Sequence, residues 1–230
     1  MARTLTAQID KIRQILHPYK DCSGKFLYSA YETLALGDLY FLGINPGGTI
    51  HNDPSEVIGS SLELLPGRIK NEFLDDTWRG KKPGTSTLQK RVQKLIQGIG
   101  YDIRSVCASN LIFIRSKNLT NLENFNQLCQ ACWPVHELII TEIVKPKVIL
   151  TMGTDKKSAS GFLYERHYKK FKEDAELTLF ASGHGRTRCQ YFRTVVNDHP
   201  LLVIAVPHLS RHNLSDPAID HIRSLVEAEL

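Results

Sequence analysis

The chain has 230 residues, of which 42% are hydrophobic and 23% are charged, proportions typical of a soluble globular protein with a sizeable core. Its 29 basic and 24 acidic residues give a formal charge of +5, which permits an anionic partner but does not require one. No run approaches the roughly 20 apolar residues of a membrane-spanning helix, so we expect no membrane partner.

The N-terminal sequence, MARTLTAQIDKIRQIL, is amphipathic and lacks a signal-peptide core, which predicts a cytoplasmic protein. The five cysteines form no even disulfide framework, and only Cys129 and Cys132 have the spacing of metal ligands. Because no second pair accompanies them, packing thiols are favoured over a metal site. We therefore predict neither a metal nor a cofactor.

Helix and strand patterns alternate along the chain without a repeat or an obvious linker, which indicates a single α/β domain over residues 1–230. Helices are predicted where apolar residues recur at helical spacing and where capping residues precede them. They are a first helix over about 6–16, one beginning at Ser86-x-x-Gln89, one beginning at Thr120-x-x-Glu123 and bending near Pro134, and a closing helix beginning at Asp216-Pro217.

Strands are predicted at four short and almost continuous apolar runs, with a weaker candidate at 177–181. The four runs are 38–44, 105–114, 147–152 and 201–207. Such runs are typical of strands that are covered on both faces of a parallel sheet. Because parallel sheets place their sites beyond the carboxyl ends of the strands, the residues that follow these runs are candidates for a site.

Polar and flexible residues follow every one of the four runs. They are Asn45-Pro46-Gly47-Gly48, Arg115-Ser116-Lys117, Gly153-Thr154-Asp155 and the hexapeptide His208-Leu209-Ser210-Arg211-His212-Asn213. A further asparagine, Asn110, lies inside the second run, where a buried amide needs a partner or a purpose.

Taken in order, these motifs resemble those of the uracil-DNA glycosylase superfamily. Gly43-Ile44-Asn45-Pro46-Gly47 is identical to the first motif of the mismatch-specific uracil/thymine branch and is close to that of the single-strand-selective branch. The hexapeptide at 208–213 is similar to the second motif, and the segments SNLIF and PKVILTMG lie between the two. The resemblance extends over roughly residues 38–215.

The resemblance implies a three-layer α/β/α fold with a central four-stranded parallel sheet, in which the four runs take the order 2-1-3-4. It also implies a monofunctional DNA glycosylase, which hydrolyses the N-glycosidic bond of uracil or a related deaminated or damaged base during base excision repair. Such an enzyme would act as a monomer on DNA without a cofactor, and in a bacterium it would associate with the nucleoid.

Roles in catalysis and base recognition follow from the resemblance. Asn45 would position the attacking water, since an amide is no strong general base, and His208 would donate a hydrogen bond to the base oxygen that gains charge. Asn110 would read the pairing edge of the flipped base. At Gly47 the uracil-only enzymes of the superfamily carry a bulky tyrosine, so the base pocket of this chain should be permissive.

The remaining predicted site residues would bind DNA. Gly48 and Ser210 would approach phosphates, Lys117 and Arg211 would add positive charge, and His212 aligns with the residue that the family inserts into the vacated base stack. Basic residues also gather at 79–82 and in the helix that begins after Ser86. They are more typical of a solvated face than of a DNA groove. They are Arg79, Lys81, Lys82, Lys90 and Arg91.

The chain departs from the family pattern at several positions. No aromatic residue lies within 48–60 to stack on a flipped base, and the nearest are Phe73 and Trp78 in a long insertion. Leu209 stands where proline is usual. Cys132 resembles one ligand of the iron–sulfur branch, but no matching set accompanies it, so we predict no cluster.

Alternatives therefore stay open. Asn45 to Gly48 could be only a strand-ending turn, Asn110 could satisfy nearby backbone, and His208 could be a capped surface histidine. The main alternative function is a non-catalytic nucleic-acid- or phosphate-binding member of the same fold. A nucleotide-binding α/β protein is less favoured, because the chain has no P-loop and no Gly-x-Gly-x-x-Gly pattern.

Overall fold

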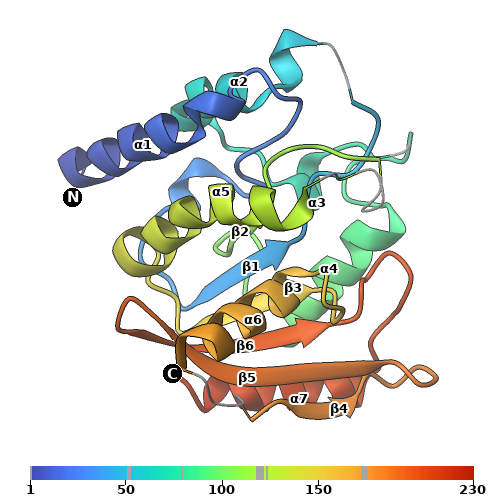
Figure 1. The fold of residues 1–230 in the computed structure, drawn as a ribbon. Coiled ribbons are helices and arrows are strands. Elements are labelled where there is room, and N and C mark those ends of the chain that lie inside the picture. The colour runs from blue at the N-terminus through green and yellow to red at the C-terminus, as the bar shows by residue number, and fades with distance from the viewer. Residues whose placement is uncertain (1, 51–52, 79, 118–121, 123, 172–175) are drawn as a thin grey trace.

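One six-stranded mixed sheet forms the centre of the protein in the computed structural model (Figure 1). The residues that the structure describes are 2–50, 53–78, 80–117, 122, 124–171 and 176–230. The strands are β1 Leu39–Gly43, β2 Cys107–Asn110, β3 Val148–Met152, β4 Thr178–Ala181, β5 Arg188–Val196 and β6 His199–Val206. Their order across the sheet is β2-β1-β3-β6-β5-β4.

The predicted sheet of four parallel strands is corrected to a mixed sheet of six. Strands β2, β1, β3 and β6 are parallel, and β5 and β4 continue the sheet beyond β6 as an antiparallel pair. The weaker run at 177–181 corresponds to β4. Strand β5 was missed because polar and charged residues interrupt Arg188–Val196, whereas the prediction relied on continuous apolar runs.

The second predicted strand, 105–114, is too long. Only Cys107–Asn110 pairs with β1, and the chain then leaves the sheet. Leu111, Ile112 and Phe113 are nevertheless fully buried. Burial in the core therefore explains their apolar character, which a periodicity argument cannot distinguish from that of a buried strand.

Helices cover both faces of the sheet. They are α1 Ala2–Leu16, α2 Ile58–Glu63, α3 Glu72–Asp75, α4 Thr87–Gly98, α5 Phe125–Leu138, α6 Ala159–Phe171 and α7 Asp216–Glu227, with a π-helical turn at Ile139–Ile143 and 3-10 turns at His17–Tyr19, Tyr31–Thr33, Pro54–Glu56 and Leu65–Gly67. No helix in the described part of the chain is both long and apolar enough to cross a membrane.

The predicted helix starts differ in their outcome. The capping box of α4 is confirmed, with Ser86 and Gln89 bonded to each other's backbone N–H. Helix α7 begins at Asp216, as predicted, although its cap is Ser215 and not Asp216: the Ser215 hydroxyl accepts from the Ala218 N–H at 3.3 Å. The box at Thr120-x-x-Glu123 lies outside the described residues. Helix α5 contains Pro134, as predicted, and continues into the π-helical turn.

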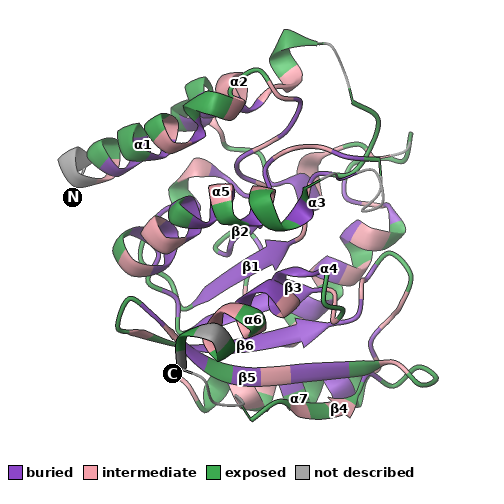
Figure 2. Ribbon diagram, in the orientation of Figure 1, coloured by how far each residue is buried: buried purple, intermediate pink, exposed green. Residues whose placement is uncertain are grey.

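Alternate residues of the strands supply two separate cores. Strands β1, β2 and β3 are buried along their lengths and β6 is buried from Leu201 onward, whereas β4 and β5 also carry exposed residues (Figure 2). Tyr40 and Leu42 face the core beneath α1, α5 and α6, whereas Leu39 and Phe41 face the core beneath α4 and α7. Because side chains two residues apart share a face, each strand carries this division toward its carboxyl end.

Candidate functional site

The register of the parallel strands places the predicted site residues at one edge of the sheet. Gly43 pairs with Asn110, and Met152 pairs with Val206, so the four strands end in one row. Asn45 and His208 each lie two residues beyond this row. All three predicted polar residues are therefore at the carboxyl edge, where parallel sheets hold their sites.

Asn110 is buried at this edge with an amide that is only partly satisfied. It is 6% exposed, and its Nδ2 has no hydrogen-bond partner among the described residues. Its Oδ1 lies against Gly43, where a Cβ would come within 2.1 Å of it. A glycine in this strand thus makes room for the amide of its neighbour.

The unpaired Nδ2 of Asn110 is one of three buried side-chain polar atoms without a partner in the described structure, the others being Tyr101 Oη and Trp133 Nε1. A buried donor that loses water without gaining a partner costs about 1–3 kcal/mol. A ligand with an acceptor oxygen at this edge would remove that cost.

Asn45 is half-buried in the turn after β1, and its amide group is fixed from one side. Nδ2 donates to Ser116 Oγ at 2.8 Å and to the Pro46 carbonyl at 2.9 Å. Oδ1 accepts no hydrogen bond from the described residues, so this oxygen can bind a water or a ligand donor. The side chain thus links the turn after β1 to the segment after β2 through Ser116.

Arg115 stabilises the turn that carries Asn45 through hydrogen bonds. Its guanidinium donates to the Gly47 carbonyl at 2.9 Å and to Glu56 at 2.6 Å. Gly48 adopts φ +112°, which a residue with a side chain rarely tolerates. A Cβ at Gly47 would meet no atom within 4 Å, so open space lies where a side chain would stand.

His208 follows β6 and is half-buried. Its Nδ1 accepts from the Ser210 backbone N–H at 3.2 Å and is 2.8 Å from Ser210 Oγ. Because a backbone N–H can only donate, Nδ1 carries no proton and the neutral ring carries it on Nε2. Burial, and after it the electrostatic effects of Arg211 and His212, lowers the His208 pKa and favours this neutral form.

Contacts from both sides hold the segment after His208. Leu209, which stands in place of the usual proline, is 1% exposed and packs into the core beneath α4 and α7. Arg91 of α4 donates to the Leu209 carbonyl at 2.8 Å. This arginine therefore stabilises the segment after His208 and is not only part of a solvated face. The Ser210 hydroxyl, predicted to meet a phosphate, belongs to an exposed residue and lies 2.8 Å from Nδ1 of the His208 ring.

The other predicted DNA-binding residues are accessible. Lys117 and Arg211 are exposed, and His212 is half-buried. Neither Lys117 nor Arg211 forms an ion pair with any residue in the described part of the chain. The structure thus leaves both positive charges free at the edge that holds Asn45 and His208.

Tyr28, which sequence reasoning missed, brings an aromatic ring to the site. Its N–H donates to the Ala108 carbonyl of β2 at 2.8 Å. Its ring centroid lies 5.9 Å from that of Phe73 and 6.5 Å from that of Trp78. All three rings pack with the core beneath α4 and α7, on the face that Ala108 and Asn110 share.

The pKa of the Tyr28 hydroxyl is raised in the folded protein. Burial and then the negative charge of Glu72 raise this pKa well above its ordinary value, while the Asn110 amide opposes the shift. The phenol is therefore un-ionised at neutral pH. Tyr28 precedes the first motif in a segment without a strand or helix pattern, so no signal in the sequence points to it.

The two cysteines with ligand-like spacing lie in the core. Cys129 and Cys132 lie on the buried side of α5. Burial raises the pKa of the Cys129 thiol to about 12 and that of the Cys132 thiol to about 11. Both thiols are therefore protonated at neutral pH. Among the described residues, no group of three or more His, Cys, Asp or Glu side chains could hold a metal ion.

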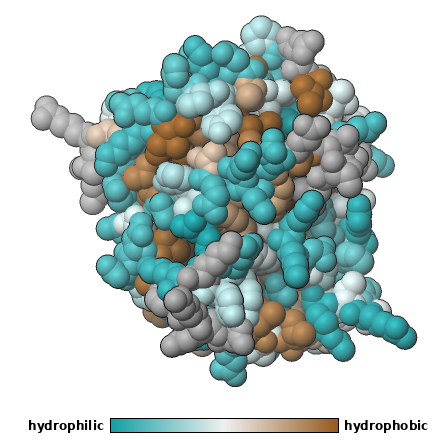
Figure 3. Space-filling view, viewed as in Figure 1, coloured by the Kyte–Doolittle hydropathy of each residue, from teal (hydrophilic) through white to brown (hydrophobic). Residues whose placement is uncertain are grey.

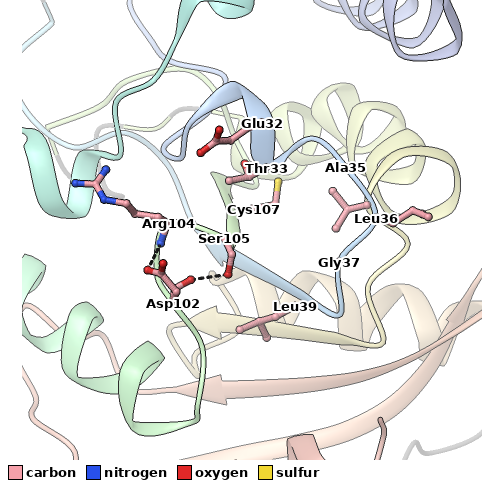
Figure 4. A pocket seen from close by; sticks show the side chains of 11 residues that line it. Glu32, Thr33, Ala35, Leu36, Gly37, Leu39, Asp102, Arg104, Ser105 and Cys107 are labelled. Carbon is pink, nitrogen blue, oxygen red and sulfur yellow. Dashed lines mark hydrogen bonds between the residues drawn. The ribbon is translucent and has the colours of Figure 1, made fainter. Parts of the chain in front are cut away.

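A cavity of about 370 Å³ lies at the opposite edge of the sheet, beside the amino ends of β1 and β2 (Figure 4). Several of its polar groups already have partners: Asp102 accepts from the Arg104 N–H at 2.9 Å and from Ser105 Oγ through its carbonyl at 2.7 Å. The Arg104 guanidinium pairs with Asp75 at 2.8 Å. None of the predicted site residues lines this cavity.

No family model matches the chain, and no curated protein is significantly similar to it.

Proposed function

We propose that the protein is a monofunctional DNA glycosylase that removes uracil or a related deaminated base, with the glycosylase-like arrangement of its four parallel strands as the scaffold. The observation that carries the proposal is the buried, unpaired Nδ2 of Asn110 at the carboxyl edge of the sheet. Deaminated bases present a carbonyl oxygen where the parent bases present an amino group. A fixed donor at this place favours the deaminated base.

The proposed reaction breaks the bond between the base and the sugar. The bonding electron pair leaves with the base, whose carbonyl oxygen gains negative charge, and His208 would donate to that oxygen through Nε2–H. Asn45 Oδ1 would orient a water toward the sugar carbon, and the water would lose a proton to solvent as it adds. The departing base anion takes up a proton from solvent, so the products are a free base and an abasic site.

The aromatic residues would complete the base pocket. A base can be reached only after it leaves the duplex stack, and it then needs a flat apolar surface to replace its neighbours. Tyr28, whose N–H donates to the carbonyl of Ala108 two residues before Asn110, is partly exposed, and Trp78 next to it is also partly accessible. We propose Tyr28 as the surface that replaces the aromatic residue missing after the first motif.

The decisive experiment is single-turnover cleavage of oligonucleotides that contain uracil or hypoxanthine, with alkali to reveal abasic sites. Asn110→Asp keeps the shape of the side chain but replaces the donor by an acceptor, so the rate should fall about a hundredfold or more. Asn126→Ala, at an exposed position of α5, is the matched control and should cleave like the wild type.

Two outcomes would contradict the proposal. If Asn110→Asp cleaves as fast as the wild type, Asn110 does not read the base. If the wild type binds these oligonucleotides without cleaving either base, the protein is a non-catalytic nucleic-acid-binding member of the fold.

A further inference from the structure

We propose that the hairpin between β4 and β5 is an additional DNA-binding element, which contacts the phosphate backbone beside the flipped nucleotide. The tip of this hairpin is residues 182–187, and Arg188 begins β5. The inference rests on the proposed function, and it adds a surface that none of the motifs includes.

The register of the sheet brings the hairpin tip to the candidate site. Strand β5 pairs antiparallel with β6, with Gln190 opposite Ala205, so the residues before Arg188 extend past the end of β6. His208 also lies just past that end, and adjacent strands are about 4.8 Å apart. Figure 1 shows the hairpin tip and the chain after β6 beyond the same edge of the sheet.

The tip is positively charged and unpaired. The segment 182–188 reads SGHGRTR and contains no acidic residue. Arg186 and Arg188 are exposed, and neither forms an ion pair or a side-chain hydrogen bond with the described residues. Figure 3 shows a hydrophilic projection where Figure 1 places the tip. Unpaired arginines on a projecting turn suit the phosphates of a nucleic acid, which they bind through paired N–H groups.

The tip is also held in place, which reduces the entropy lost when it binds. Ser182 Oγ donates to the Thr187 carbonyl at 3.0 Å, and Thr187 Oγ1 donates to the His184 carbonyl at 2.6 Å. The Ser215 N–H donates to the Ser182 carbonyl at 3.0 Å. Since Ser215 follows the His208 segment closely, one network fixes the hairpin relative to the candidate site.

The hairpin should matter only for DNA that is long enough to reach it. A substrate of a few nucleotides fills the base pocket and ends before the hairpin, whereas a duplex continues across it. The two arginines should therefore contribute to the affinity for duplex DNA and not to the cleavage of a very short oligonucleotide.

The test measures binding to a duplex that carries a tetrahydrofuran abasic analogue, which the enzyme cannot cleave, over a range of salt concentrations. Arg186→Ala/Arg188→Ala should weaken binding about tenfold per arginine near 0.1 M salt and reduce the salt slope by about two. Arg186→Lys/Arg188→Lys keeps the charge and should retain most of the slope. Lys145→Ala/Lys147→Ala is the control, because it removes two exposed charges at the opposite edge.

Each result is decisive. If the wild type binds the duplex and the double alanine variant keeps its affinity and slope, the hairpin is not part of the interface, and the proposed function stands without it. If the lysine control weakens binding equally, net charge alone explains the effect and the hairpin proposal fails. If the wild type binds no duplex, the proposed function and the hairpin proposal fail together.

Discussion

Asn45 and His208 each have a nearby serine hydroxyl, and in both cases the atom left free is the one that the proposed reaction needs. Ser116 accepts from Asn45 Nδ2 and leaves Oδ1 open, while Ser210 engages His208 Nδ1 and leaves Nε2–H open. Orientation by a fixed neighbour is how a weak catalytic group gains effect without a change in its own chemistry.

The prediction at Asn45 follows from this geometry. Asn45→Ala removes the water-binding oxygen, so single-turnover cleavage of a uracil-containing oligonucleotide should slow by about two orders of magnitude or more, with DNA affinity almost unchanged. Asn45→Asp should restore or raise the rate at neutral pH, because a carboxylate stabilises a developing sugar cation and can accept a proton.

The matched measurement is the stability of the two variants. A residue that merely ends a strand would give equal cleavage rates in the wild type, Asn45→Ala and Asn45→Asp, with a loss of only about 0.5–2 kcal/mol in the free energy of unfolding. That result would assign Asn45 to the turn alone.

Among the secondary-structure elements, α4 links the insertion to the candidate site. Gln89 closes the capping box with Ser86, and its Nε2 donates to the carbonyls of Glu72 and Asp76 at 2.8 Å each. These residues flank Phe73 and precede Trp78. The cap of α4 therefore also fixes the segment that carries Phe73 and Trp78, two of the three aromatic rings that pack together near the site.

Substitutions in this cap should differ in cost. Ser86→Ala removes one capping interaction and should lower the free energy of unfolding by about 1 kcal/mol. Gln89→Ala should cost more, about 2–3 kcal/mol, because it also removes a donor from the buried Glu72 carbonyl and one of the two donors of the Asp76 carbonyl, the other being the Gly84 N–H. Urea unfolding of both variants measures the difference, and equal losses would show that the two carbonyls find other partners.

The elements differ in how far the sequence predicts them, for physical reasons. Strands β1, β3 and β6 are covered on both faces, so their apolar runs are continuous and easily recognised. Strand β5 mixes exposed arginines with buried residues, and its pattern resembles a polar loop. Most of the run at 105–114 is apolar because residues 106–113 are buried near the sheet, although only Cys107–Asn110 pairs.

Within the molecule as a whole, His136 makes the core sensitive to acid. It is completely buried, with Nδ1 2.9 Å from Tyr40 Oη and Nε2 3.0 Å from the Leu111 carbonyl. Nε2–H donates to that carbonyl, so Nδ1 accepts from the tyrosine and the ring is neutral. Burial lowers its pKa from 6.5 to about 4.

The folded state therefore binds this proton less readily than the unfolded chain does. The stabilisation is fully present above pH 6.5, and it is lost as the pH falls from 6.5 toward about 4, by about 3 kcal/mol at most. Urea unfolding across this range should show the decline, and His136→Gln should flatten it. A slope that His136→Gln leaves unchanged would assign the acid sensitivity to other groups.

The candidate site divides into a part that the sequence predicts and a part that it does not. Asn45, Asn110 and His208 are predictable because each lies at or just past the end of a buried strand, so strand order alone brings them to one edge. Tyr28 and the hairpin tip reach that edge through backbone pairing between distant segments, at β2 and at β6. Such pairing leaves no periodic pattern in either segment.

The segment 23–28 lies along the outer side of β2, with bridges from Gly24 to Ile114 and from Leu27 to Ser109. A fragment that began at the first motif would lose this cover and offer the bare main chain of β2 to other molecules, a common route to self-association. It would lose Tyr28 as well. Residues 23–28 are thus an integral part of the fold, and a shortened version of this protein, made for crystals or for engineering, should begin before residue 23.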